Sequence, residues 1–99
     1  MAKYFITRHA GAVEWQSRIG LNAIIIEHFN VSVVKPGDLV HGNLPVEMAA
    51  EVIARGGRYF NLDMKVPREK RGNDHSAGEM QTYGAKLTEY SVVRLGGRN

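Results

Sequence analysis

Three consecutive polar residues, Thr7, Arg8 and His9, directly follow an apolar stretch and are the best candidates for chemistry in the chain. A guanidinium can bind a phosphate through two parallel hydrogen bonds, and an imidazole can act as a general base. Gly11 comes next, and residues 12–19 favour a helix. A helix N-terminus offers free N–H groups and a potential that favours anions. The pattern therefore predicts a phosphate-binding turn between a strand and a helix.

Each of these residues also has an ordinary structural interpretation. Arg8 could pair with Glu14 at the surface, and Thr7 could simply cap the turn. His9 could cap the helix or remain solvated. Trp15 shares a helical face with another apolar residue, which predicts a core side chain rather than a platform on which a base stacks.

A second turn of the same kind is predicted after a short strand at residues 39–42. Gly42 and Asn43 precede Pro45, which suits the first helical position because its missing N–H would have no partner there. Residues 46–54 are apolar at helical spacing and end at two glycines. Asn43 would cap this helix by default. Because parallel strands end at one edge of a sheet, the two turns are expected to converge on one anion.

Lys70, Arg71 and Gly72 lie in the longest clear loop of the sequence, residues 67–75. Such a loop could close over an anion, although most charged loops are only solvated. His41, inside a predicted strand, is expected to have no chemical role.

The composition excludes several kinds of site. The chain has no cysteine, and its four histidines show no metal-ligand spacing. The glycine-rich signatures of phosphate loops and dinucleotide sites are absent, as is the Gly-x-Ser-x-Gly signature of hydrolases. We therefore expect neither a metal nor any other cofactor.

Length and charge point to a small domain with an anionic partner. Ninety-nine residues with a net charge of +3 and a pI of about 9.5 form one mildly basic domain, residues 1–99. No run is long enough to span a membrane, and the N-terminus lacks a signal-peptide pattern. A cytoplasmic protein without a membrane partner is expected.

The order of expected elements is strand, helix, strand, short strand, helix, strand, helix, strand, which predicts an α/β fold with a mainly parallel sheet. Residues 22–29 contain a continuous β-branched run, which predicts a strand buried on both faces. Residues 31–34 are a further β-prone piece, which could form a hairpin with residues 39–42 across a type II turn. Ser76 and Glu79 form a capping-box pattern before a helix. Residues 86–95 are the last strand, parallel or antiparallel, and residues 96–99 are a tail.

Residues 58–66 alternate between apolar and polar side chains. A half-polar strand fits poorly in the middle of a helix-covered sheet. We therefore expect an edge strand, or a strand whose polar face contacts a partner.

Five motifs follow one another along nearly the whole chain: Thr7-Arg8-His9-x-Gly11-Ala12-x-Glu14-Trp15, Gly37-Asp38-x-Val40-x-Gly42-x-Leu44-Pro45-Val46, Ala49-Ala50, Arg55-Gly56-x-Arg58-Tyr59 and Arg71-Gly72. Taken together, they resemble a small family of CRISPR-associated proteins, the sixteenth of the Csx series, found beside type III systems. In that family a Thr often stands where this chain has Asn43, which can still cap or donate a hydrogen bond.

The resemblance implies a ring nuclease that linearises cyclic tetra-adenylate, the second messenger of type III systems, and so switches the response off. It implies a Rossmann-like (CARF-like) domain that forms a homodimer, with the ring over the two-fold axis. Catalysis would need no metal and no long nucleic acid, because the ribose 2′-OH attacks its own 3′-phosphate. The expected catalytic residues are Arg8, His9 and Arg71, and the expected ligand-binding residues are Thr7, Gly11, Trp15, Gly42, Asn43, Leu44, Pro45, Lys70 and Gly72.

Two other functions fit the same residues. A non-catalytic binder would sequester the ring without cutting it. An interaction subunit would dock on a CRISPR complex or on single-stranded RNA through the polar face of residues 58–66, although the aromatic residues of this chain lie inside strands, which argues against single-strand binding.

Overall fold

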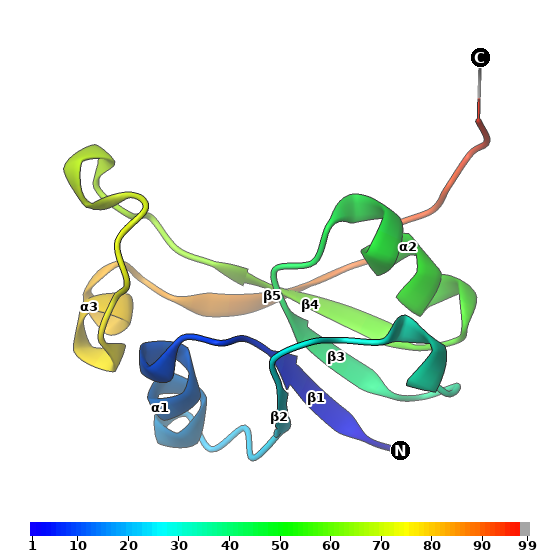
Figure 1. Ribbon diagram of the computed structural model, residues 1–99, viewed down its shortest axis with the longest axis horizontal. Helices are drawn as coiled ribbons and strands as arrows, with labels where there is room; N and C mark the ends of the chain where they lie inside the picture. Colours follow the sequence, from blue (N-terminus) through cyan, green and yellow to red (C-terminus); the bar gives the residue numbers. More distant parts are fainter. Residues whose placement is uncertain (98–99) are drawn as a thin grey trace.

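A computed structural model describes residues 1–97, so the last two residues of the expected tail lie outside the described residues. Five strands form one sheet in the order β2-β1-β3-β4-β5 (Figure 1). The first four strands are parallel, and β5 is antiparallel to β4. The strands are β1 (Lys3–Ile6), β2 (Ile24–Ile26), β3 (Leu39–Gly42), β4 (Arg58–Asp63) and β5 (Lys86–Tyr90). The prediction of one α/β domain with a mainly parallel sheet is confirmed.

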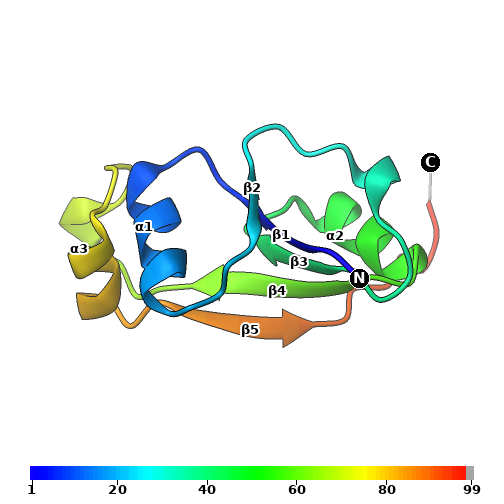
Figure 2. The same ribbon diagram turned by 90° about the horizontal axis from the view of Figure 1, so that it is seen from below.

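Helices cover both faces of the sheet. Figures 1 and 2 show α1 (Ala10–Arg18) and α3 (Ala77–Thr82) side by side, with α2 (Val46–Ala54) on the other side of the molecule. The 3-10 helices η1 (Val31–Val33) and η2 (Arg68–Lys70) lie in the connections. The predicted capping box at the start of α3 is confirmed.

The core consists of two apolar clusters, one on each face of the sheet. Beneath α1 and α3, Phe5 and Leu62 of the sheet pack with Trp15, which is 3% exposed. Beneath α2, Val40 and Tyr59 of the sheet pack with residues of the helix. Trp15 is therefore a core residue, as its helical spacing predicts.

The strand order places the ends of β1 and β3 beside each other. After β1 the chain passes through α1 to β2 at one edge, then returns to form β3 on the other side of β1. Ile6 is in register with both Ile26 and Gly42, so the three strands end at the same level. In open α/β sheets this reversal point, at the carboxyl ends of the strands, is where ligands bind.

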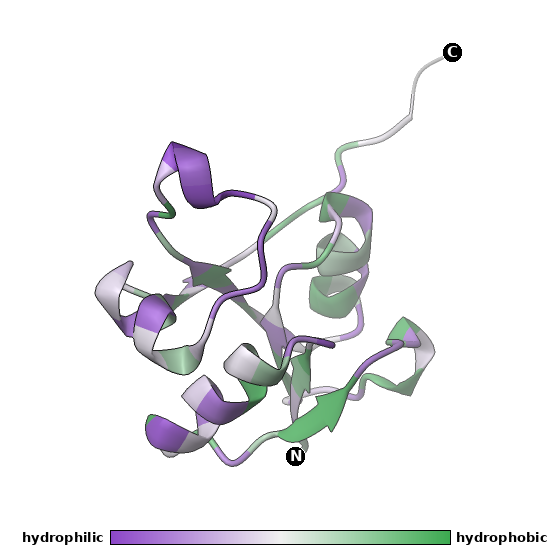
Figure 3. Ribbon diagram, turned by 60° about the vertical axis from the view of Figure 1, so that its left-hand side comes forward, coloured by the Kyte–Doolittle hydropathy of each residue, from purple (hydrophilic) through white to green (hydrophobic). Residues whose placement is uncertain are grey.

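Two expectations for residues 22–34 are wrong. The strand β2 is not buried on both faces, because it forms an edge of the sheet with Ile24 56% exposed. Figure 3 shows this strand as a hydrophobic segment at the margin of the fold. Residues 31–33 form η1 rather than a strand, because the Asn30 side chain accepts a hydrogen bond from the Ser32 backbone N–H and closes a tight turn.

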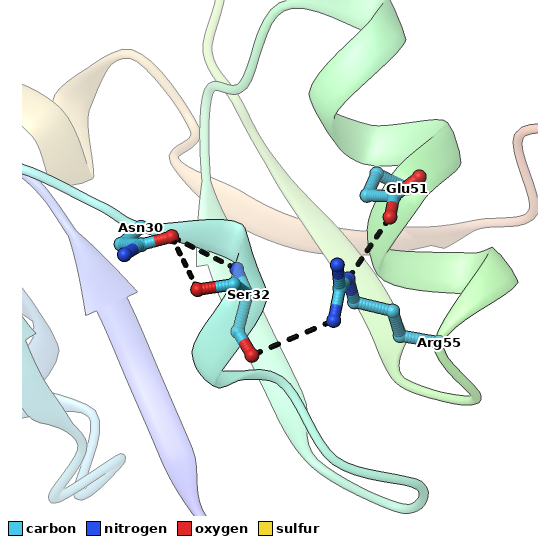
Figure 4. A network of polar contacts seen from close by, with 4 residues as sticks. All are labelled: Asn30, Ser32, Glu51 and Arg55. Atoms are coloured by element: carbon cyan, nitrogen blue, oxygen red, sulfur yellow. Dashed lines mark hydrogen bonds and ion pairs between the residues drawn. The ribbon is translucent and has the colours of Figure 1, made fainter.

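A polar network holds η1 against α2 (Figure 4). The Arg55 guanidinium donates to Glu51 at 2.9 Å and to the backbone carbonyl of Ser32 at 3.5 Å. This attachment fixes the segment that leads into β3. The turn at residues 35–38 forms as predicted, with Gly37 at φ 86°, but β3 makes no hairpin with residues 31–34, since it pairs with β1 and β4.

The strand β4 is not an edge strand, so the first of the two expectations for residues 58–66 is wrong. It lies between β3 and β5, and its polar side chains bond to one another. The Tyr59 hydroxyl donates to Asn61 Oδ1, and Asn61 Nδ2 donates to Asp63 Oδ1 at 2.6 Å. The polar side chains of Tyr59, Asn61 and Asp63 therefore form an internal network, and a partner contact on this face stays a prediction.

Candidate functional site

A cleft of about 590 Å³ opens at the carboxyl ends of β1 and β3. Its volume is within the range of about 300–1,000 Å³ that is typical of small-molecule sites. The cleft is lined by Phe5, Ile6, Thr7, Arg8, His9, Ala12, Glu27, His28, Phe29, Gly42, Asn43, Leu44, Pro45, Met48, Leu62, Met64, Asn73, Asp74, His75 and Met80. Both predicted turns thus border one cavity.

The first turn presents Arg8 and His9 to the cleft. Thr7 Oγ1 accepts a hydrogen bond from the His9 backbone N–H at 3.2 Å, so the threonine caps the turn. Arg8 is exposed, and the expected alternative pairing with Glu14 is absent because Glu14 pairs with Arg18 at 3.3 Å. Within residues 1–97, Arg8 makes no ion pair. Its guanidinium remains available to an anion.

His9 is oriented by a carboxylate from a distant part of the chain. Its Nδ1 lies 2.9 Å from Asp74 Oδ1, with both side chains largely exposed. A carboxylate that accepts from Nδ1–H fixes the ring tautomer and leaves the Nε2 lone pair free. The exposed pair adds little to stability, but it gives His9 the arrangement of a general base.

The second turn is anchored from β4. The Tyr59 hydroxyl accepts a hydrogen bond from the Leu44 backbone N–H at 3.0 Å and contacts the Gly42 carbonyl at 3.1 Å. Burial is the main cause that raises the pKa of Tyr59, so the hydroxyl stays protonated. When the Asn43 amide is oriented with its nitrogen toward the sheet, it donates to the Leu62 carbonyl at 2.9 Å.

The two turns lead into helices that start at the cleft. The N-cap of α1 is His9 and the N-cap of α2 is Pro45, and neither side chain caps its helix. The first N–H groups of a helix have no partner within it, and the helix dipole adds positive potential there. Together with Arg8, these helix starts make this edge of the cleft suited to phosphate.

Several of the predicted site residues lie elsewhere. Arg71, Lys70 and Gly72 do not line the cleft, and Arg71 Nε points back to the Val66 carbonyl at 3.4 Å. The structure therefore does not support a catalytic position for Arg71. Trp15 is in the core.

Gly11 also lies outside the cleft, and its role is steric. A Cβ on Gly11 would come within 1.8 Å of the His75 carbonyl oxygen. The glycine therefore allows α1 to pack closely against the segment that carries Asp74 and His75.

Other residues of the cleft were not predicted from the sequence. Asp74 and His75 enter it from the loop before α3, and Phe29 and Met48 add an apolar wall. No sequence signal could have linked Asp74 to His9, because their contact depends on how α1 packs on α3.

Among residues 1–97, no group of three or more histidine, aspartate or glutamate side chains could hold a metal ion. In the same part of the chain, every helix is too short or too polar to cross a bilayer.

A comparison with protein-family models identifies the family of this chain. Residues 4–93 match the family model described as "Putative CRISPR-associated protein (Cas_VVA1548)". The chain belongs to this family. The matched residues include both strand-to-helix turns, the loop with Asp74 and His75, and all of the sheet except Lys3 at the start of β1. No solved structure matches the chain.

Proposed function

We propose that this CRISPR-associated chain is a metal-independent ring nuclease that cleaves cyclic tetra-adenylate into linear di-adenylates with 2′,3′-cyclic phosphate ends. The observation that carries the proposal is the cleft in which Arg8, His9 and two helix N-termini surround one space at the carboxyl ends of β1 and β3. These groups suit a phosphodiester, and His9 adds a base.

A Rossmann-like (CARF-like) architecture is part of this proposal. It is supported by the strand order with its reversal between β1 and β3, by helices on both faces, and by the position of the cleft. Nucleotide sites in Rossmann-like sheets occupy the same place.

In the proposed reaction, the ribose 2′-oxygen attacks the adjacent 3′-phosphorus and His9 Nε2 takes the 2′-OH proton. The bond from phosphorus to the 5′-oxygen breaks, which leaves a 2′,3′-cyclic phosphate and a free 5′-OH. Arg8 stabilises the charge that develops on the phosphoryl oxygens. Holding the 2′-oxygen in line with the departing oxygen supplies a further part of the rate.

We also propose that the chain acts as a homodimer, so that two clefts serve one ring. A groove between α2 and the C-terminal segment has an apolar lining that includes Val46 and Val93, which are 70% and 67% exposed. Glu47 and Arg94 border the same groove, and opposite charges on one patch suit a self-complementary two-fold contact. Pro45 of the cleft adjoins Val46 of the groove, so this contact would bring two clefts near one axis.

The test is incubation of the purified protein with an excess of cyclic tetra-adenylate in EDTA, followed by chromatography and mass spectrometry. Repeated turnover to di-adenylates with cyclic phosphate ends is expected. Tight binding with an unchanged ring would replace the enzyme with a binder that sequesters the messenger, and absence of binding would remove the ring as ligand.

A further inference from the structure

The proposed cleavage needs an acid as well as a base, and this need is the starting point of an inference that rests on the proposed function. Breaking the bond between phosphorus and the 5′-oxygen leaves an alkoxide unless a proton arrives as the bond breaks. General acid catalysis of such a step contributes typically about 10²–10⁴-fold. His9, which receives the 2′-OH proton, cannot donate to the leaving oxygen in the same step.

Two further histidines line the cleft, and they differ in how they are held. His28 is exposed in the connection between β2 and η1. His75 is half-buried, and its ring meets Tyr83 edge-on at 5.3 Å between centroids. The backbone of His75 is fixed on its C-terminal side, because its carbonyl packs against Gly11 and the capping box of α3 begins at the next residue. A catalytic acid needs this kind of fixed position.

His75 also lies next to the proposed base. Asp74, its neighbour in the chain, contacts His9 Nδ1 at 2.9 Å, so one loop brings both the partner of His9 and a second histidine to the wall of the same cleft. Near His9, the charged groups are Asp74 and Arg8. Near His75, the titratable groups are Glu79 and Tyr83. The pKa of Glu79 is lowered chiefly by the backbone N–H of Ser76, and the charge of His75 lowers it further.

We propose that His75 is the general acid of the reaction, acting opposite the base that Asp74 and His9 form. As the 2′-oxygen bonds to phosphorus and loses its proton to His9 Nε2, the imidazolium of His75 gives a proton to the departing 5′-oxygen. The products are a 2′,3′-cyclic phosphate and a neutral 5′-OH. His9 ends the step protonated and His75 ends it neutral, so a proton exchange with water restores both.

The experiment compares His75→Gln, His75→Ala and the control Arg18→Gln, whose residue does not line the cleft, on two substrates. One substrate is cyclic tetra-adenylate, and the other has sulfur in place of each bridging 5′-oxygen. A thiolate leaves without protonation, so the sulfur substrate does not need the acid. We expect both His75 variants to lose about 10²–10⁴-fold in kcat on the oxygen ring and to cut the sulfur ring at nearly the wild-type rate. The control variant should keep both activities.

A pH profile adds a second readout. In the wild type, the rate on the oxygen ring should fall at high pH, and His75→Gln should remove that fall. Three outcomes would each overturn the assignment. The His75 variants could lose equal activity on both substrates, or His75→Gln could keep full activity. The sulfur ring could also restore the activity of His9→Gln and not that of the His75 variants. A wild type that cuts neither ring would instead contradict the proposed function, so the two failures are distinguishable. Melting temperatures and ring binding of each variant separate loss of fold from loss of the acid.

Discussion

At the scale of single residues, Arg8 is the proposed phosphate contact of the site. It is exposed at the cleft and makes no ion pair within residues 1–97. Another arginine on the adjoining helix, Arg18, is paired with Glu14 and does not line the cleft. The two arginines therefore form a matched pair of which only Arg8 lines the cleft.

We expect Arg8→Gln to lower kcat on cyclic tetra-adenylate by about 10²–10³-fold, the cost of removing one donor to a developing oxyanion. Arg18→Gln should change kcat less than two-fold, although it removes the same charge. Steady-state kinetics at fixed ionic strength check both. Equal losses in the two variants would mean that net charge, rather than position, drives the reaction.

A second residue-scale prediction concerns His41, a buried histidine of β3. This imidazole is 3% exposed, lies stacked between Phe5 and Phe60, and contacts the Tyr4 carbonyl at 2.8 Å through Nδ1. Burial is the main cause that lowers its pKa in the folded protein. The folded state therefore binds a proton less readily than the unfolded state does.

The free energy of unfolding should accordingly decrease as the pH falls below about 6.5, the usual pKa of histidine in an unfolded chain, and continue to fall toward the lower folded value. Urea unfolding at a series of pH values measures this slope. His41→Asn should be less stable but should flatten the slope in this range, whereas the exposed His28→Asn should keep it. An unchanged slope in His41→Asn would assign the effect to another group.

At the scale of elements, the site depends on how closely α1 approaches the start of α3. Gly11 faces the His75 carbonyl with no room for a Cβ, whereas Gly78 in α3 has only Ser76 Oγ within 4 Å of such an atom. Both glycines lie within helices and neither has a positive φ. Alanine should therefore have opposite effects at the two positions.

We expect Gly11→Ala to destabilise the fold by about 1–3 kcal/mol through overpacking and to reduce ring cleavage, because Asp74 and His75 move away from α1. Gly78→Ala should stabilise the fold by about 0.5–1 kcal/mol with activity unchanged. Chemical denaturation measures the free energy of unfolding of each variant, and turnover of the ring by the same samples measures its activity. A stable, fully active Gly11→Ala would show that the close approach is unimportant.

The sequence predicts elements well where the signal is local. The β1–α1 turn, the turn at Gly37 and the capping box at Ser76 each depend on neighbouring residues, and each forms as expected. The burial of β2 could not be predicted, because it depends on which strand becomes the edge of the sheet. The place of Arg71 likewise depends on the path of a loop, and the role of Asp74 on packing between two helices.

At the scale of the whole molecule, the proposed dimer can be tested by substitutions in its apolar groove. Val46→Glu with Val93→Glu would place like charges in the groove between α2 and the C-terminal segment. Both side chains are exposed in the single chain, so the fold should persist while the dimer dissociates and ring cleavage falls. Analytical ultracentrifugation and circular dichroism measure assembly and fold. A matched pair on the far side of the molecule, Ile24→Glu with Ile25→Glu on the exposed edge strand, should leave the dimer intact.

Full dimerisation of the Val46 and Val93 double variant would place the interface elsewhere. Dissociation with undiminished cleavage would show that one cleft suffices for the ring.

The most direct test of the account is to map where the ring binds, using cyclic tetra-2′-deoxyadenylate, which lacks the attacking hydroxyl and so remains intact. Titration into isotopically labelled protein, followed by amide NMR shifts, should perturb residues 7–12, 42–48 and 73–75 together. That pattern would place the ligand where the ends of β1 and β3 meet. Shifts confined to the groove of Val46 and Val93, or to only one of the two turns, would contradict it.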